Sequence, residues 1–211
     1  MPELPEVETI RRGLQRRVTG RRIVRVEGRE IRLRTPTALA TLRRELGNRR
    51  IEALDRRGKY LLLHLSGGRV LVVHLGMTGR LTLTPSSAPA EPHTHVRLGL
   101  EPDGELRFSD PRRFGMLFVV RRAELERHPR FANLGPEPLG PDFSPEYLQA
   151  RARRLRKPVK NFLMDAAIVV GVGNIYAAEA LYRAGVNPRI AVGRLSPTRW
   201  GPTGRGGITL H

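Results

Sequence analysis

The spacing of apolar residues changes twice along this chain, and this change limits the folds that it can adopt. Val7, Ile10, Leu14 and Val18 recur at the spacing of one helical face, which predicts an N-terminal helix. Up to about residue 121, apolar residues then alternate or form short runs between Gly-rich and Pro-rich turns, as in β-strands. Helical spacing returns in the last third of the chain. The pattern predicts an α+β fold with strands and helices in separate parts of the sequence.

The β-rich part has the turn signals of an antiparallel sandwich or barrel. Ser66-Gly67-Gly68 and Pro102-Asp103-Gly104 separate runs of hairpin length. A short helix is expected within residues 37–46. The expected strands cover residues 23–26, 51–54, 60–65, 69–75, 96–100, 106–108 and 114–120. We predict an N-terminal antiparallel β-sandwich that carries the N-terminal helix.

A Pro-rich stretch, residues 136–141, indicates a linker between two domains. Three helical segments are expected beyond it: one capped by Ser144 and running to about residue 155, one starting at Pro158, and one capped by Asn174. The predicted domains are a β-sandwich over residues 1–135, a helical domain over 136–193 and an irregular tail over 194–211.

The chain carries a large excess of positive charge. It has 38 Lys and Arg against 20 Asp and Glu, a formal net charge of +18. The basic residues cluster, and residues 151–160 contain several of them without any acid. Such an excess destabilises a compact chain unless a polyanion neutralises it. A nucleic-acid partner is the favoured interpretation, with an anionic membrane or a plain solvated surface as alternatives.

Other features exclude several classes of protein. The sequence has no cysteine, so it cannot form disulfides or a zinc site built on thiolates. Its apolar runs, such as those at 61–63 and 70–73, are far shorter than the roughly 20 residues that span a bilayer. The N-terminus has no apolar stretch typical of a secretion signal. We expect a cytoplasmic, monomeric protein without membrane association.

Three residues near the N-terminus are candidates for chemistry. Removal of Met1 would leave Pro2 with a secondary amine, which can attack a sugar C1′ and form an iminium ion that promotes elimination. Glu3 and Glu6 supply neighbouring carboxyl groups for general acid or base catalysis. Plainer alternatives exist on composition alone: Pro2 protects the chain from aminopeptidases, and acids are common in a first helical turn.

Lys59 is one of three lysines in a chain that otherwise uses arginine. It follows Arg56-Arg57-Gly58 and precedes an apolar run. Unlike arginine, a desolvated lysine can lose its proton, so it can transfer one. The alternative is a surface lysine whose stem lies along apolar side chains.

Two glycine-containing loops have compositions suited to nucleic acid. Arg112 and Phe114 lie in the segment DPRRFG and combine a guanidinium with an aromatic ring, as needed for phosphates and stacked bases. Met77 lies in the segment LGMTG, where core packing is less expected than usual and an apolar side chain can enter a duplex.

Two further patterns are weaker signals. Gly171-Val172-Gly173-Asn174 opens a helix and would present backbone N–H groups to an anion. His93 and His95 have the chemistry of metal ligands, but the sequence offers them no third ligand. A DNA contact or a solvated loop is therefore the favoured interpretation of the histidines, and no metal site is predicted.

Six sequence blocks together resemble the bacterial formamidopyrimidine-DNA glycosylase (Fpg) family. They occur in the order and spacing typical of that family over about residues 1–190. The blocks are PELPEVET at 2–9, RRGKYLLLHL at 56–65, HLGMTGRL at 74–81, DPRRFG at 110–115, LGPEPL at 134–139 and VGVGNIYAAEAL at 170–181. Agreement of all six by chance is negligible.

The resemblance implies a bifunctional DNA glycosylase and AP lyase of base excision repair. Such an enzyme flips an oxidised purine, 8-oxoguanine or a formamidopyrimidine, out of duplex DNA and excises it. Pro2 would be the nucleophile, Glu3 the acid that acts at the sugar, and Lys59 the proton donor associated with β-elimination. The residues that match gap-filling positions of the family are Met77, Arg112 and Phe114, and those that match backbone-contact positions are His93, Arg112, Lys160 and Asn174.

Two departures from the family pattern qualify these expectations. Family members bind zinc through a four-cysteine hairpin that follows a complete helix-two-turns-helix domain. This chain has no cysteine, so we expect a partial helix-two-turns-helix domain, no zinc hairpin and no cofactor, as in a chain truncated at its C-terminus. Leu155 stands where members often carry a basic phosphate contact, and Arg154 is the neighbouring substitute. We expect both departures to weaken DNA binding and activity.

Three alternatives therefore remain open. The first is a catalytically inactive, DNA-binding remnant of the family. The second is a general basic nucleic-acid binder whose motifs are only structural. The third is the preference for oxidised pyrimidines of the related endonuclease VIII branch, against which the PELPEVE opening argues.

Overall fold

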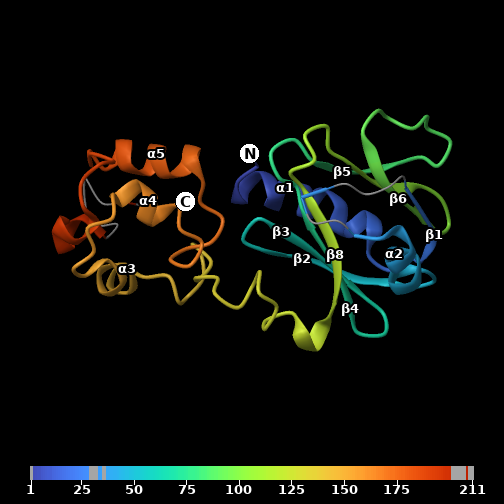
Figure 1. Ribbon diagram of the computed structural model, residues 1–211, viewed down its shortest axis with the longest axis horizontal. Helices are drawn as coiled ribbons and strands as arrows, with labels where there is room; N and C mark the ends of the chain where they lie inside the picture. Colours follow the sequence, from blue (N-terminus) through green and yellow to red (C-terminus); the bar gives the residue numbers. More distant parts are fainter. Residues whose placement is uncertain (1, 29–32, 35–36, 201–207, 209–211) are drawn as a thin grey trace. The chain divides into compact units, whose positions relative to one another are not determined.

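The computed structural model describes residues 2–28, 33–34, 37–200 and 208, which form two compact units, Met1–His128 and Pro129–His211 (Figure 1). The Pro-rich stretch that the sequence analysis used as a boundary belongs to the second unit. Its backbone is bonded there, because the Gly135 N–H donates to the Ala166 carbonyl at 2.8 Å and the Val170 N–H to the Pro136 carbonyl at 3.1 Å.

The described part of the first unit is a β-sandwich of two four-stranded antiparallel sheets, as the sequence predicts (Figure 1). One sheet has the strand order β1-β6-β7-β5 and the other β2-β3-β4-β8. Their inward-facing side chains share one hydrophobic core. The strands are β1 (Ile23–Gly28), β2 (Ile51–Arg57), β3 (Tyr60–Leu65), β4 (Arg69–His74), β5 (Arg80–Thr84), β6 (Thr94–Leu100), β7 (Glu105–Ser109) and β8 (Met116–Arg121), and η1 (Arg122–Glu124) follows them.

Helix α1 (Leu4–Val18) packs against β2, β3 and β5. It buries Val7, Leu14 and Val18, the face that the apolar spacing predicts. Glu3 is its N-cap and Pro5 lies in its first turn, where the missing N–H of proline is tolerated. A second helix, α2 (Leu39–Leu46), matches the short helix expected before β2.

Two strand predictions need correction. The sequence analysis missed β5, because its segment RLTLT has only two apolar residues. In the structure, one of them, Leu81, is buried and pairs with Phe108 of β7. Strand β8 begins at Met116 rather than at Phe114. The strand starts later because the Gly115 N–H donates to the Asp110 carboxylate at 2.7 Å, which makes Gly115 part of the preceding turn.

The described second unit is helical, with α3 (Pro145–Ala152), α4 (Val159–Leu163), α5 (Asn174–Arg183), η2 (Val192–Arg194) and η3 (Pro197–Trp200). The Ser144 hydroxyl accepts a hydrogen bond from the Tyr147 N–H at 3.1 Å and caps α3, as predicted. Helix α3 stops at Ala152, before residue 155, and Arg154 just beyond it has the left-handed φ of +63°. Gly185 ends the α5 region with a φ of +61°.

Two predictions for this unit are wrong. Asn174 does not cap α5 but is its first residue, because Gly173 takes the extended N-cap conformation. The segment after residue 193 is not a loose tail in its described part: Trp200 is 3% exposed and Ile208 5% exposed. The Trp200 ring meets that of Phe162 edge-on at 5.8 Å. One large aromatic ring can anchor a segment that has no apolar periodicity, so the apolar spacing did not predict that this segment packs into the core.

Among the helices of the described residues, none combines the length with the apolar character that crossing a bilayer requires.

Candidate active site

The start of α1 brings Pro2 and two carboxyl groups together. Glu3 is only 2% exposed, whereas Pro2 is half-buried and Glu6 is exposed. The Glu3 N–H donates to the Glu6 carboxylate at 3.0 Å, and the Glu3 carboxylate accepts the Glu6 N–H in return, a capping box. This arrangement assigns Glu6 a structural task, to orient Glu3 and the residue before it.

Lys59 lies in a two-residue hairpin turn between β2 and β3. Arg57 pairs with Tyr60, and Gly58 adopts a φ of +55°, which a residue with a side chain would adopt only with strain. Burial lowers the pKa of Lys59, and the negative charges of Glu3 and Glu6 oppose that shift. The charges of Glu3 and Glu6 therefore act on Lys59 from a segment far away in the sequence.

A network that the sequence analysis missed connects α1 to this turn. The Arg11 guanidinium donates to both carboxylate oxygens of Glu8, at 2.7 and 2.9 Å. Arg56, in β2, donates to Glu8 at 3.2 Å and to the Gly58 carbonyl at 3.0 Å. Hydrogen bonds from Arg11, and then from Arg12 and Arg56, lower the pKa of Glu8 to about 2 against the opposing effect of burial. The only sequence signal was an acid with basic residues three and four positions later.

Strands β3 and β4 connect the Lys59 turn to the loop that carries Met77. The rings of Tyr60, beside Lys59, and His74, at the end of β4, lie 4.9 Å apart. The His74 Nδ1 accepts the Gly76 N–H at 3.0 Å, which orients the loop that carries Met77. His74 belongs to the block HLGMTGRL at 74–81. Its ring contacts depend on the register of β3 and β4, so the sequence alone could not predict them.

Met77 and Phe114 project from two loops at the ends of β4 and β7. Although both are apolar, Met77 is 42% exposed and Phe114 43% exposed. The Arg112 guanidinium lies 4.8 Å from the centre of the Phe114 ring, within cation–π range. Exposed apolar tips with a neighbouring cation have the composition that the sequence analysis assigned to base stacking and phosphate contact.

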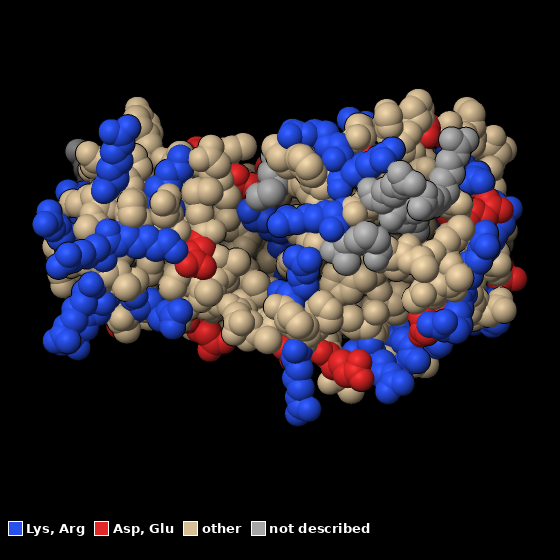
Figure 2. Space-filling model, viewed as in Figure 1, with Lys and Arg blue, Asp and Glu red and all other residues tan. Residues whose placement is uncertain are grey.

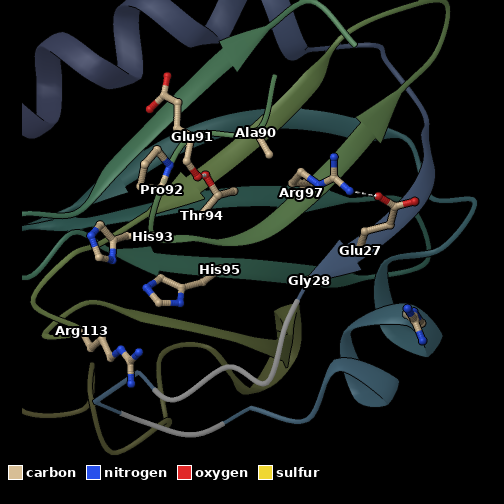
Figure 3. Close-up of a pocket in the computed structure, with 11 residues that line it drawn as sticks. Glu27, Gly28, Ala90, Glu91, Pro92, His93, Thr94, His95, Arg97 and Arg113 are labelled. Atoms are coloured by element: carbon tan, nitrogen blue, oxygen red, sulfur yellow. Dashed lines mark hydrogen bonds and ion pairs between the residues drawn. The ribbon is translucent and has the colours of Figure 1, made fainter. Parts of the chain in front are cut away.

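The two histidines, both labelled in Figure 3, have different environments. His93 is exposed with a φ of +62°, whereas the buried His95 pairs its Nε2 with the Asp110 carbonyl at 2.8 Å. Both line a pocket of about 770 Å³, with Arg113 nearby. Among the described residues, no cluster of three or more His, Asp or Glu side chains is able to hold a metal ion. His95 is thus a structural residue, and His93 is the accessible one.

The remaining candidates belong to the second unit. Arg154 is exposed beside α3, next to the exposed Leu155. Lys160 lies in the first turn of α4, with its N–H donated to the Pro188 carbonyl at 3.3 Å. Asn174 is exposed at the start of α5. The structure therefore places each of them at a helix end.

Positive charge covers much of the visible surface of both units. Figure 2 shows many Lys and Arg side chains on this face of each unit, with far fewer acids among them. Several of the basic side chains are committed to ion pairs, such as Lys157 with Asp165 at 2.6 Å. The excess nevertheless remains large, because the chain has 38 basic against 20 acidic residues.

Comparison with known proteins identifies the family of this chain. The model of the formamidopyrimidine-DNA glycosylase N-terminal domain matches residues 1–117, and the model of the formamidopyrimidine-DNA glycosylase H2TH domain matches residues 134–201. The chain belongs to the formamidopyrimidine-DNA glycosylase family. It thereby ranks among the DNA glycosylases of base excision repair.

Individual family members are similar over most of this chain. The formamidopyrimidine-DNA glycosylase of Acidithiobacillus ferrooxidans is 50% identical over 200 residues, which cover 95% of this chain and 73% of the relative. That of Moorella thermoacetica is 50% identical over 189 residues, 90% of this chain and 69% of the relative. A solved complex between the Lactococcus lactis Fpg and DNA containing an abasic site has a TM-score of 0.87 and 33% identity, covering 93% of this chain and 72% of that one.

The four-cysteine zinc hairpin of the formamidopyrimidine-DNA glycosylases has no counterpart in this sequence. Zinc in that hairpin needs four thiolates, and the chain has no cysteine. The residues present therefore do not fit a zinc site of that kind.

Proposed function

We propose that this chain excises oxidised purines, 8-oxoguanine and formamidopyrimidines, from duplex DNA and then cleaves the strand at the resulting abasic site. The family supports DNA glycosylase activity. The oxidised purine as substrate and the lyase step are our proposal. The observation that carries it is the shared electrostatic site of Glu3, Glu6 and Lys59 next to Pro2.

In the proposed reaction, Pro2 acts as the nucleophile once Met1 is removed. Its secondary amine forms a bond to C1′ and loses its proton while the glycosidic bond breaks, and the base leaves with the bonding electrons and takes up a proton. Glu3 protonates O4′ as the sugar ring opens, which produces an iminium ion between Pro2 and C1′. Loss of a C2′ proton then expels the 3′ phosphate, and water releases the amine.

In these reaction steps, Lys59 is the proposed proton carrier. Because burial lowers its pKa, its neutral form is more populated at neutral pH than that of a surface lysine. A lysine that releases its proton more readily than a surface lysine is suited to deliver and remove protons during ring opening and elimination. The nearby charges of Glu3 and Glu6 limit this lowering of the pKa and favour the protonated form.

Duplex DNA is the proposed partner. The solved structures that this chain resembles include Fpg complexes with abasic-site DNA and with DNA containing N7-benzyl-Fapy-dG. On this chain, Met77 and Phe114 are exposed apolar tips that would fill the space left by an extruded base, with Arg112 beside them. His93, Arg154, Lys160 and Asn174 are the proposed backbone contacts.

Borohydride trapping tests the covalent step. Borohydride reduces an iminium ion to a stable amine, so the protein should become cross-linked to duplex that contains 8-oxoguanine or an abasic site. Pro2→Gly should trap more weakly through a primary amine, and Glu3→Gln should suppress base excision more than cleavage at a preformed abasic site. Pro5→Ala, a proline substitution within the helix, is the matched control and should still trap.

Intact-mass measurement gives an independent check. The mature chain should begin at Pro2, and retention of Met1 would block the amine and contradict the proposal. Absence of any cross-link at saturating protein would instead support an inactive, DNA-binding remnant. A panel of duplexes tests specificity, because faster excision of oxidised pyrimidines than of 8-oxoguanine would identify the endonuclease VIII-like alternative.

A further inference from the structure

Asp110 is a buried carboxylate at the centre of two exposed loops. It is 0% exposed and directly follows β7. One of its oxygens, Oδ1, accepts the Thr78 hydroxyl at 2.5 Å and the Arg112 N–H at 3.2 Å. The other, Oδ2, accepts the Gly115 N–H at 2.7 Å. The carboxylate therefore holds both sides of the turn that carries Phe114 and also reaches the loop that carries Met77.

The backbone of Asp110 holds a third loop. Its N–H donates to the His93 carbonyl at 3.1 Å, and its carbonyl pairs with the Nε2 of His95 at 2.8 Å. The same carbonyl accepts the Arg113 N–H at 3.3 Å. Figure 3 shows His93, His95 and Arg113 grouped at one side of the pocket. Asp110 is thus bonded to residues from each loop that carries a proposed DNA contact in the first unit.

The first two loops are also in direct backbone contact. Gly76 has a φ of +63°, and a Cβ added there would lie 2.5 Å from the Gly115 nitrogen. A Cβ added at Gly115 would lie 2.6 Å from the ring of Phe108, in the core. Contacts this close leave no room for a side chain at either position. The spacing between the loops is therefore set by a glycine contact and by the Thr78 hydroxyl, which donates to Asp110 and accepts the Arg112 N–H at 3.3 Å.

We propose that Asp110 is a positioning residue for base extrusion, and that its bond to Thr78 fixes the spacing between Met77 and Phe114. The inference rests on the proposed function, because it concerns how the exposed side chains enter the duplex. An apolar tip can replace an extruded base only if it enters the stack at the right height, and the two tips lie on different loops. A buried carboxylate that accepts three hydrogen bonds supplies the required rigidity.

A pair of substitutions at Thr78 isolates the hydrogen bonds that its hydroxyl makes between the loops. Thr78→Val removes the hydroxyl at nearly constant volume, and with it the hydrogen bond to Asp110 and the one that the hydroxyl accepts from the Arg112 N–H at 3.3 Å. The Asp110 bonds to Arg112 and Gly115 stay in place, whereas Thr78→Ser keeps the hydroxyl. The matched control is Thr84→Val on β5, which deletes a buried hydroxyl that has no hydrogen-bond partner among the described residues. Unfolding midpoints of all three variants should be measured first, to separate misfolding from mispositioning.

The decisive measurement compares two substrates. Excision from an intact 8-oxoguanine pair requires the base to be extruded, whereas a preformed abasic site has no damaged base to extrude. Thr78→Val should slow excision by about tenfold or more, the scale expected for a small misplacement, and change abasic-site cleavage by no more than about twofold. Thr78→Ser should restore excision, and 2-aminopurine fluorescence beside the lesion should report slower opening only in Thr78→Val.

A double-mutant cycle tests the route of the effect. If the bond acts through Phe114, adding Thr78→Val to Phe114→Ala should slow excision little further, because the side chain being positioned is already absent. Additive losses would overturn the inference, as would equal losses on both substrates or normal excision by Thr78→Val. A wild-type protein inactive on both substrates would instead refute the proposed function, so the two failures are distinguishable.

Discussion

Replacing Glu8 with glutamine tests the network that joins α1 to the Lys59 turn. The Glu8 carboxylate accepts hydrogen bonds from Arg11, from Arg12 at 2.7 Å and from Arg56, and Arg56 also holds the Gly58 carbonyl. Glutamine keeps the shape of the side chain but loses the charge, so Glu8→Gln removes the charged part of these contacts. We expect the first unit to become less stable at neutral pH.

The magnitude follows from the pKa of Glu8, which is about 2 against an ordinary 4.5. At about 1.36 kcal/mol per pKa unit, this difference sets an upper bound of about 3.4 kcal/mol. Solvent reaches 21% of the Glu8 side chain and 75% of that of Arg12, so screening reduces the effect. We expect a loss of about 1 to 2 kcal/mol in the free energy of unfolding.

The pH dependence provides the sharper test. A carboxyl group whose pKa is lowered by folding stabilises the protein above its unfolded pKa, and that stabilisation is lost as the pH falls through the folded value. The difference between wild type and Glu8→Gln should therefore be complete above about pH 5.5 and should fade from about pH 4.5 to pH 2. Urea unfolding followed by far-UV circular dichroism measures it, because the sole tryptophan, Trp200, lies in the second unit.

A matched control separates this network from an ordinary surface pair. Glu52 pairs with Arg122 at 2.8 Å, with 44% and 49% of their side chains exposed. Glu52→Gln should change stability by less than about 0.5 kcal/mol. A stability difference for Glu8→Gln that is as small as this control, or that persists unchanged at pH 2, would refute the reasoning.

Four further outcomes are expected. Lys59→Met should reduce strand cleavage at a preformed abasic site more than borohydride trapping, and Lys59→Arg should not rescue it, because arginine does not release its proton; product gels would show an equal loss of both if Lys59 were only structural. Trp200→Ala should destabilise the second unit by about 3 to 5 kcal/mol, seen as faster hydrogen exchange in residues 134–200 with little change in the first unit. Affinity for lesion duplex should fall steeply between about 50 and 200 mM salt, and a flat response in a fluorescence-anisotropy titration would contradict the charge argument. EDTA should leave the unfolding midpoint and the activity unchanged, so a drop on chelation would reveal a metal site that the sequence does not predict.

Local properties of the sequence determined the element types and the family. The spacing of Val7, Leu14 and Val18 is a property of neighbouring residues, so it predicted which face of α1 is buried. The short runs between turn residues predicted the strands for the same reason, except for β5, where Leu81 and Leu83 are too few to signal a strand. The motif blocks and the excess of arginine pointed to the family and to a polyanionic partner without any tertiary information.

Only the tertiary structure decided which distant side chains act together. The influence of Glu3 on Lys59 depends on how α1 packs against the β2–β3 hairpin, and the link from Asp110 to Thr78 depends on the register of β5 and β7. Hydrogen bonds and burial act over a few ångströms between segments far apart in sequence, so no local pattern records them. For that reason the sequence marked Pro2, Glu3 and Lys59 one by one, and only the fold brings Lys59 within the electrostatic influence of Glu3.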